Sequence, residues 1–401
     1  MVDNTFLLQT VQDILPQLTE FRHQLHSHPE LSGQECHTSQ RIQAQLTAWG
    51  IPFRAGHTAV LGEITGKEPG PCVVLRGDMD ALPIGEESGL SFASQIPGVM
   101  HACGHDIHTT ILLGAAYVLS RCRDFAGTVK LAFQPAEETG GGLEELIDLG
   151  LLEPQPDAFL AAHICPDTPA GKLHVKAGPA MTASSRFHVE FTGSGGHAAL
   201  PHQAQDCILA AAKFVSQLPE ISRRISPLEP FTLSVGYLSA GEAGRGNIIP
   251  AKAVLEGTIR TPKREIHDLA HQATETLLRA TAMTTGTQGQ ITFRNGSDCV
   301  MNDPALTAVF TKGAAELLGR DQVLESPGVY LASDNFARLS RMAPSVYFRL
   351  GGKPTGQTKT YPLHSPRFAA DDGAIFPGTA ALSQGALDFL SHLRRYSHGT
   401  D

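Results

Sequence analysis

Four short apolar runs place the strongest constraint on how this chain can fold. Each run is five or six residues of mainly Val, Leu, Phe and Ala, as expected for a buried strand. Between the first two runs, apolar residues recur at helical spacing over 106–120, and Asp106 stands where a helix N-cap is expected. Alternating strand and helix periods predict an α/β fold with a mainly parallel sheet. The four runs are residues 72–76, 128–133, 158–162 and 345–350.

A second pattern follows in the middle of the chain. With 401 residues the chain exceeds the size at which a single core usually keeps growing, so two domains are expected. Residues 182–295 show the order βαββαβ, which is typical of a ferredoxin-like α+β unit. We therefore predict a larger domain in two parts, 1–181 and 296–401, with the smaller domain inserted between them. The expected strands are 186–192, 231–238, 253–260 and 290–294, and the expected helices are 206–218 and 264–282.

Acidic or imidazole side chains follow three of the predicted strands. Asp80 comes after the first, Glu137 and Glu138 after the second, and His163 directly after the third. Any one of them can be an ordinary loop residue. In open α/β sheets, however, the carboxyl ends of the strands form the edge where ligands bind. Three such strands together predict a functional site at this edge.

The stretch from His101 to His108 carries one cysteine and three histidines just before the predicted helix. In an extended or bent segment, Cys103 and His105 share one face and can bind the same cation. A structural zinc site needs a second ligand pair, and the seven cysteines contain no Cys-x-x-Cys. A reduced core cysteine beside solvated histidines remains an alternative for this stretch alone.

Composition excludes several classes of function. The net charge of −9 and the lack of a basic run argue against a nucleic-acid partner. No run of eighteen apolar residues indicates a membrane span, and the first twenty residues lack the basic start of a signal peptide. Seven scattered cysteines favour reduced thiols over a disulfide framework. We expect a cytoplasmic protein without membrane or nucleic-acid partners.

The adjacent carboxylates Glu137 and Glu138 suit metal-assisted hydrolysis. Such a pair is often only a solvated loop. Here it follows an apolar strand and a Gln-Pro turn, so one carboxylate can bind a cation while the other removes a proton from water. Asp80 suits a supporting role, accepting the free ring N–H of a ligating histidine.

Six motifs in sequence resemble those of the M20 metallopeptidase clan, in particular its amidohydrolase branch of hippurate hydrolases, N-acyl-amino-acid deacylases and auxin-conjugate hydrolases. The resemblance covers nearly the whole chain. The motifs are Arg76-Gly-Asp-Met-Asp80-Ala-Leu-Pro, Met100-His-Ala-Cys103-Gly-His105-Asp, Phe133-Gln-Pro-Ala-Glu137-Glu138, Gly195-Gly-His197-Ala-Ala-Leu-Pro-His202, Asn247-Ile-Ile-Pro250 and Leu363-His364-Ser-Pro.

The resemblance implies a zinc-peptidase-like catalytic domain with two divalent metal ions. Zinc, manganese, cobalt and nickel, and iron as well, all fit the mixed donor set. Glu137 would act as general base and then as the acid that protonates the leaving amine. Cys103 would bridge the metals, and the remaining ligands would be His105, Glu138, His163 and His364.

The resemblance also implies that the inserted domain is a lid and a dimerisation surface, so a homodimer or higher oligomer is expected. His197 would help to stabilise the oxyanion. Asn247 and Arg260 would hold a substrate carboxylate, a task that suits an arginine. On the sequence alone, Arg260 is equally well explained as a surface charge.

Two positions depart from the pattern. Asp78 stands where other branches of the clan carry a metal-binding histidine. Asp334 and Asn335 stand where close relatives usually have Glu and Asp, which concerns the acyl pocket more than the chemistry.

The leading hypothesis is a metal-dependent amidohydrolase that cleaves N-acyl amino acids. A dipeptidase or carboxypeptidase of the same clan is the nearest alternative. Cys103 as a covalent nucleophile and a non-catalytic binding protein are two further readings.

Overall fold

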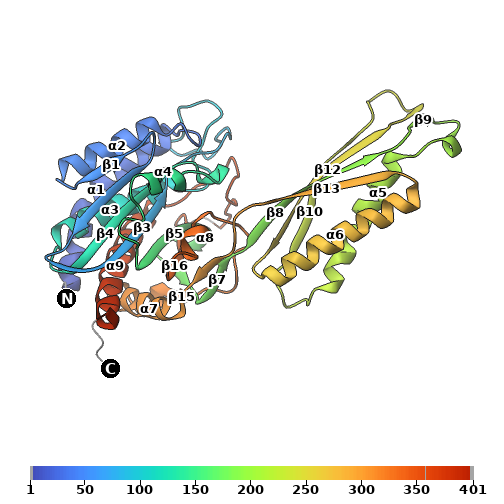
Figure 1. The fold of residues 1–401 in the computed structure, drawn as a ribbon. Coiled ribbons are helices and arrows are strands. Elements are labelled where there is room, and N and C mark those ends of the chain that lie inside the picture. Colours follow the sequence, from blue (N-terminus) through green and yellow to red (C-terminus); the bar gives the residue numbers. More distant parts are fainter. Residues whose placement is uncertain (1–2, 357, 398–401) are drawn as a thin grey trace. The chain divides into compact units, whose positions relative to one another are not determined.

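The computed structural model describes residues 3–356 and 358–397. This part of the chain forms two compact units, which we describe separately (Figure 1). The range 182–295 predicted for the insertion lies within the second unit. The first unit consists of Met1–Ala180, Met301–Pro327 and Arg338–Asp401, and the second of Met181–Val300 and Gly328–Ala337.

An eight-stranded sheet with the order β1-β2-β4-β3-β5-β16-β6-β15 organises the first unit. Its four central strands run parallel to one another. These four contain the four apolar runs of the sequence, so the predicted α/β class with a mainly parallel sheet is confirmed. They are β4 (Ala126–Gln134), β3 (Glu68–Asp78), β5 (Ala158–Pro169) and β16 (Ser345–Lys353).

Antiparallel pairing is confined to the flanks of this sheet, where β1 pairs with β2, β2 with β4, and β6 with β16. The flanking strands are β1 (Phe53–Ala55), β2 (Val60–Thr65), β6 (Leu173–Val175) and β15 (Val323–Glu325). The helices of this unit are α1 (Asn4–Ser27), α2 (Cys36–Ala48), α3 (His105–Arg121), α4 (Leu143–Asp148), α7 (Pro304–Leu318), α8 (Phe336–Ser340, at the junction with the second unit) and α9 (Ile375–Ser397). Short 3₁₀ turns are η1 (Glu137–Thr139), η4 (Arg320–Gln322) and η5 (Asp372–Ala374).

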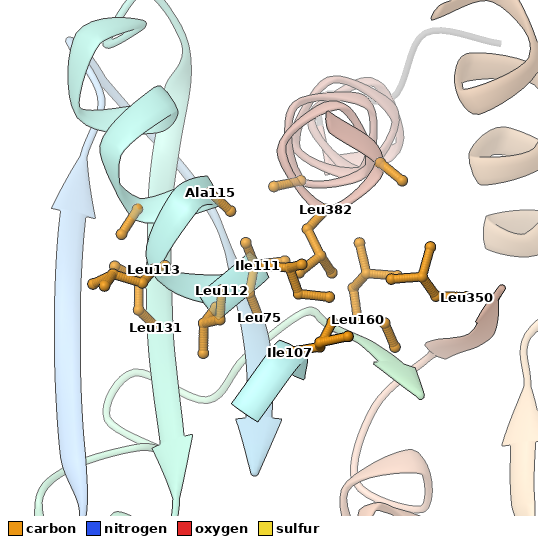
Figure 2. Close-up of a cluster of buried hydrophobic side chains, with 14 of the residues drawn as sticks. Leu75, Ile107, Ile111, Leu112, Leu113, Ala115, Leu131, Leu160, Leu350 and Leu382 are labelled. Atoms are coloured by element: carbon orange, nitrogen blue, oxygen red, sulfur yellow. The ribbon is translucent and has the colours of Figure 1, made fainter. Parts of the chain in front are cut away.

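The core of the first unit lies between the sheet and the helices α3 and α9 (Figure 2). Ile111 of α3 and Leu382 of α9 are both fully buried. They face buried strand residues such as Leu75 and Leu160. Because α3 begins at His105, this packing fixes the position of the helix that carries a candidate ligand.

The N-terminus of α3 differs from the expectation. The predicted cap Asp106 lies inside the helix, and the cap position is Gly104, whose φ of 81° is left-handed and favours glycine. The Asp106 carboxylate instead forms ion pairs with two residues of α1. Its Oδ2 lies 2.9 Å from Arg22 Nε and 2.9 Å from His26 Nδ1. The sequence showed a capping residue type at the right place, but a long-range ion pair competes for that side chain.

This buried network extends beyond α1 and α3. Arg22 Nη1 lies 2.5 Å from Asp372 in η5, and His26 Nε2 lies 3.1 Å from Glu86. Burial alone would lower the pKa of His26, but Asp106 and Glu86 raise it to about 9. His26 is therefore charged at neutral pH and links α1 to the start of α3.

The second unit has a four-stranded antiparallel sheet with the order β10-β12-β8-β13. Both helices pack on one face of it, where Phe191 and Phe214 are among the buried residues. With strands numbered along the chain this order is 2-3-1-4, the arrangement of a ferredoxin-like fold. The elements are β8 (Ala183–Thr192), α5 (Cys207–Gln217), β10 (Thr232–Ala240), β12 (Lys252–Thr261), α6 (Arg264–Thr285) and β13 (Gln288–Asn295).

Smaller elements complete the second unit and the junctions. β9 (Gly196–His197) pairs with β11 (Ile248–Ile249), and β7 (Gly178–Met181) pairs with β14 (Val300–Asn302). The 3₁₀ turns are η2 (Pro201–Gln203) and η3 (Leu218–Arg224). Within the described ranges, the helices are all too short or too polar to cross a membrane.

The His26 network predicts a pH-dependent contribution to stability. The pKa of His26 rises from its ordinary 6.5 to about 9 on folding, so its stabilisation is complete below pH 6.5 and is lost as the pH rises through 9. Replacing His26 with Gln should therefore cost roughly 3 kcal/mol more unfolding free energy at pH 6 than at pH 10. Urea unfolding at both pH values measures this difference. The exposed His57→Gln variant serves as control, and an equal cost of His26→Gln at both pH values would contradict the assignment.

Candidate metal centre

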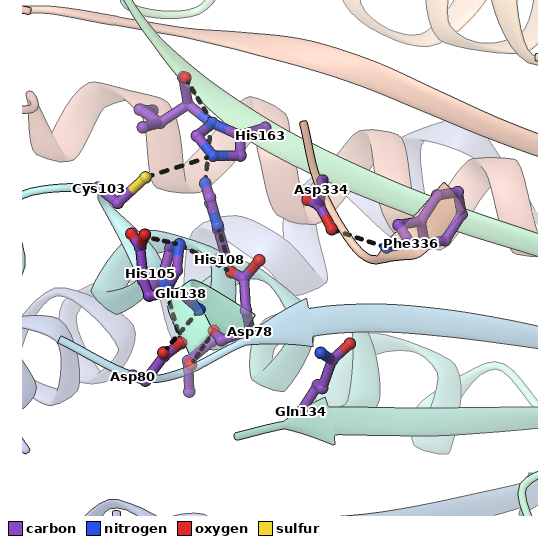
Figure 3. A network of polar contacts seen from close by, with 12 residues as sticks. Asp78, Asp80, Cys103, His105, His108, Gln134, Glu138, His163, Asp334 and Phe336 are labelled. Carbon is purple, nitrogen blue, oxygen red and sulfur yellow. Dashed lines mark hydrogen bonds and ion pairs between the residues drawn. The ribbon is translucent and has the colours of Figure 1, made fainter. Parts of the chain in front are cut away.

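The carboxyl ends of the central strands bring the candidate ligands together (Figure 3). β3 ends at Asp78 and leads to Asp80, while β4 leads into η1 with its carboxylates. The turn before α3 supplies Cys103, and the loop after β16 supplies His364. Segments far apart in the sequence thus meet at the sheet edge predicted for ligand binding.

Two groups of ligand atoms share the Cys103 thiol. In one group, Cys103, His105 and His163 each place a ligand atom within 4.8 Å of the others. In the second group, Cys103 is joined in the same way by Glu138 and His364. The Cys103 Sγ atom lies 3.6 Å from His163 Nε2, and His364 Nε2 lies 3.3 Å from Glu138 Oε1.

Hydrogen bonds fix the orientation of the two buried imidazoles. His105 Nδ1 lies 3.0 Å from Asp80 Oδ1 and donates to it, which leaves Nε2 as the free acceptor. His163 Nδ1 donates to the carbonyl oxygen of Ile164 at 2.9 Å. Both rings therefore direct Nε2 towards the cluster. Burial opposes the charge of His105, but Asp78 and the other neighbours raise the pKa of this ring well above its usual range, so a cation at Nε2 would displace a proton.

Two buried atoms at the centre of the cluster make no hydrogen bond within the described ranges. They are His105 Nε2 and Glu138 Oε1, and they lie 3.9 Å apart. Buried polar atoms are normally satisfied, so such a pair requires an ion or water. Thiolate, imidazole and carboxylate donors at this spacing fit a divalent transition metal. The residues present therefore suit metal binding.

The pKa of His163 agrees with a ligand role. Burial, with the neighbouring His108, holds the pKa of His163 well below its usual range, so the ring is neutral as a ligand must be. Burial and the Glu138 carboxylate raise the pKa of the Cys103 thiol well above its ordinary value. A bound cation would stabilise the thiolate, whereas a covalent nucleophile needs a lowered pKa without such help. The environment of Cys103 thus disfavours the nucleophile reading.

Asp78 and His108 form a separate buried pair beside the cluster. Asp78 Oδ1 lies 2.5 Å from His108 Nδ1, and its Oδ2 lies 2.6 Å from Arg76 Nη1. The Ile164 N–H donates to His108 Nε2 at 2.8 Å, so both ring nitrogens of His108 are used. Burial opposes ionisation of Asp78, but Arg76, His105 and His108 hold its pKa well below the usual range. Asp78 and His108 therefore support the ligand segments and leave no lone pair for a cation on the imidazole.

The structure adds detail at two positions. His108, which was not predicted to bind a metal, is a hydrogen-bonded support, and its spacing of three residues from His105 places both on one helix face. His163 was expected just after its strand, but β5 continues to Pro169 and pairs His163 with Arg349 of β16. The apolar run ends at residue 162, whereas β16 continues the backbone ladder as far as Pro169.

The remaining candidate residues belong to the second unit. His197 in β9 pairs with Ile248 of β11, and the Ala198 N–H donates to the Asn247 carbonyl oxygen at 3.0 Å. His197 and Asn247 are thus neighbours. Arg260 of β12 donates to the carbonyl oxygen of Leu331 at 3.5 Å. Burial and the nearby Arg186 lower the pKa of Arg260.

The departure at Asp334 and Asn335 is also located in this unit. Both side chains are buried, and Asp334 Oδ1 accepts the Phe336 N–H at 2.8 Å (Figure 3). Asp334 therefore stabilises the turn that contains it.

The support that Asp80 gives His105 generates a prediction. Asp80→Asn keeps the shape of the side chain but removes the charge that orients and polarises the imidazole, so metal affinity should fall about 10–100-fold. Competition with a chromophoric chelator measures this affinity. Asp157→Asn is the matched control, because Asp157 accepts the Cys72 N–H at 2.7 Å in another part of the unit. Wild-type affinity in the Asp80→Asn protein would rule out this role.

Comparisons with known proteins identify relatives over the whole chain. The sequence profile described as Peptidase family M20/M25/M40 matches residues 74–387. The N-acetyl-L-cysteine deacetylase of Bacillus subtilis is 36% identical over 378 residues, covering 93% of this chain and 88% of the relative. Thermostable carboxypeptidase 2 of Saccharolobus solfataricus is 33% identical over 391 residues, covering 96% of this chain and 98% of the relative. A solved structure from Bacillus subtilis, a dinuclear metal binding peptidase from the M20 family, superposes with a TM-score of 0.80 at 30% identity, covering 95% of this chain and 99% of that one.

Proposed function

The chain belongs to the peptidase family M20/M25/M40 and is a hydrolase of that family, and from this premise we propose that it hydrolyses the amide bond of N-acyl amino acids. One observation carries the proposal: Glu137 stands beside a group of thiol, imidazole and carboxylate donors. Its carboxylate places an oxygen within 4.8 Å of ligand atoms of His105 and Glu138. A relative that is named as an N-acetyl-L-cysteine deacetylase supports the substrate class.

We propose two divalent cations per subunit, held by the five ligands with Cys103 shared between them. The sharing of Cys103 by two ligand groups supports this number, as does the dinuclear relative. Zinc, manganese, cobalt and nickel all accept such donors. When bound, the cations lower the pKa of water and polarise the scissile carbonyl group. The ligands are Cys103, His105, Glu138, His163 and His364.

The protein side chains move the proton. Glu137 accepts a proton from the attacking water and later donates it to the leaving nitrogen of the amino acid. Asp80 keeps the His105 ring in the tautomer that presents Nε2. The division between Glu138 as ligand and Glu137 as base is supported by their neighbours, since the Glu138 oxygen lies with ligand atoms of Cys103 and His364, whereas the Glu137 oxygen lies with those of His105 and Glu138.

The proposal also assigns a role to the second unit. We propose that residues 182–295 act as a lid inserted between the catalytic parts 1–181 and 296–401, and that this lid also forms the contact of a homodimer. His197 would stabilise the oxyanion, and Asn247 with Arg260 would hold the substrate carboxylate. Seven free cysteines support a reducing compartment such as the cytoplasm.

Glu137→Gln tests the proposed mechanism. The amide keeps the size of the side chain but cannot accept the proton, so kcat should fall about 10²–10⁴-fold. Steady-state hydrolysis of N-acyl amino acids measures kcat, and metal analysis must give the wild-type content in the same preparation. A metal-loaded Glu137→Gln protein with full activity would exclude Glu137 as the base.

The carboxypeptidase relative gives a second candidate, cleavage of a peptide bond at a carboxyl terminus. The two candidates differ in the group on the carbonyl side of the scissile bond, which is a simple acyl group in an N-acyl amino acid and an aminoacyl or peptidyl group in a peptide. We expect kcat/KM for an N-acetyl amino acid to exceed that for the matching dipeptide and for a blocked peptide by at least about tenfold. Side-by-side assays with zinc, manganese, cobalt and nickel decide this. A preference for either peptide would favour the second candidate.

A further inference from the structure

The segment from Glu30 to Glu35 packs against the residues that follow β3, next to the proposed site. The Ala81 N–H donates to the Glu30 carbonyl oxygen at 2.8 Å, and Leu31 forms a parallel bridge with Ala81. The Ser32 hydroxyl donates to Asp80 Oδ2 at 2.7 Å. This segment is therefore fixed to the residues that follow β3, next to the support of His105.

Glu35 stands at the cap position of α2 but does not cap this helix. Glu30 supplies the caps instead, since its carboxylate accepts the His37 N–H at 3.1 Å and the Thr38 N–H at 2.8 Å. The Glu35 carboxyl turns away, and its Oε1 accepts the Ala136 N–H at 2.8 Å. The side chain thus contacts the residue directly before the proposed general base.

The backbone at Ala136 adopts a conformation that an alanine avoids. Its φ of 55° and ψ of 32° are left-handed, which is unfavourable for a non-glycine residue. Such strain persists only where the surroundings enforce it. The Ala136 carbonyl oxygen accepts the Gly141 N–H at 2.8 Å, and the Glu35 carboxylate accepts the Ala136 N–H. These two contacts keep the turn that directs Glu137.

Stability alone does not account for a glutamate at this position. Glu35 is fully buried, and its Oε2 atom has no hydrogen-bond partner within the described ranges. Burial, together with the nearby Asp80 carboxylate, raises its pKa. An apolar side chain of similar volume would avoid this cost of desolvation. An apolar side chain could not accept hydrogen bonds from backbone N–H groups, and the one from Ala136 is the bond that joins Glu35 to the turn before Glu137.

We propose that Glu35 is a positioning residue for the general base, acting through the Ala136 N–H to hold the left-handed turn from which Glu137 reaches the site. The inference rests on the proposed role of Glu137. Glu35 itself does not contact the reacting atoms.

The test compares two variants of similar volume. Glu35→Gln keeps an oxygen acceptor for the Ala136 N–H, whereas Glu35→Met removes it. Glu35→Met should lower kcat about 10–100-fold, since a displacement of about 1 Å has this effect on a catalytic group, with KM and bound metal within about twofold of wild type. Glu35→Gln should stay within about threefold of the wild-type kcat. Hydrogen exchange over residues 134–141 should increase in Glu35→Met and not in Glu35→Gln.

Glu145→Met is the matched control. Glu145 Oε1 also accepts backbone N–H groups of another segment, from Thr58 at 2.9 Å and Ala59 at 3.1 Å, but it lies on α4. This variant should lose stability and keep kcat. If Glu35→Met does not fold, Glu35→Asp replaces it, because its carboxylate is one methylene shorter.

Three results would overturn the inference: a wild-type kcat in folded, metal-loaded Glu35→Met or Glu35→Asp, an equal loss in Glu35→Gln, or unchanged exchange at residues 134–141. A wild-type protein that cleaves no N-acyl amino acid would instead refute the proposed function. The exchange measurement then still decides whether Glu35 holds this turn, because it does not depend on activity.

Discussion

The arrangement of the site depends on the hydrogen bonds that the Asp80 carboxylate accepts. It accepts hydrogen bonds from the ring of His105, the backbone N–H of Glu138 and the hydroxyl of Ser32. Burial opposes its ionisation, but these three donors and the His105 charge lower its pKa, so it stays charged. One buried anion therefore joins the start of α3, the turn η1 and the segment before α2. Loss of its charge would affect the orientation of each of them.

Backbone contacts reinforce this arrangement at the same edge of the sheet. Leu82 and Met100 form an antiparallel bridge, and the His364 N–H donates to the Ala102 carbonyl oxygen at 2.8 Å. His364 has a φ of 65° and, with Ala136, accounts for the positive φ values of non-glycine residues in the described ranges. Both residues lie beside the proposed chemistry, where strained backbone is commonly found because rigid neighbours enforce it.

The sequence was sufficient for the fold because each central strand contains an apolar run and the insertion has a clear βαββαβ order. Cys103 and His105 were recognisable from their local spacing, and the two carboxylates of η1 from their place after a strand. His364 has no local signal, and only the resemblance pointed to it. Long-range partners could not be read: Asp106 looked like a helix cap because its ion pair with Arg22 depends on tertiary structure. Glu35 was missed for the same reason, since its contact with Ala136 exists only after folding.

The distribution of the ligands along the chain has a consequence for biosynthesis. His105 lies near the first quarter of the sequence and His364 near its end, with the entire second unit between them. The complete set of proposed ligands is therefore assembled only when the C-terminal segment has been made and has packed against Ala102. A cation that requires all five donors would bind the native state and not the nascent chain, which would link metal binding to the last stage of folding. An incomplete chain would therefore lack the complete proposed site.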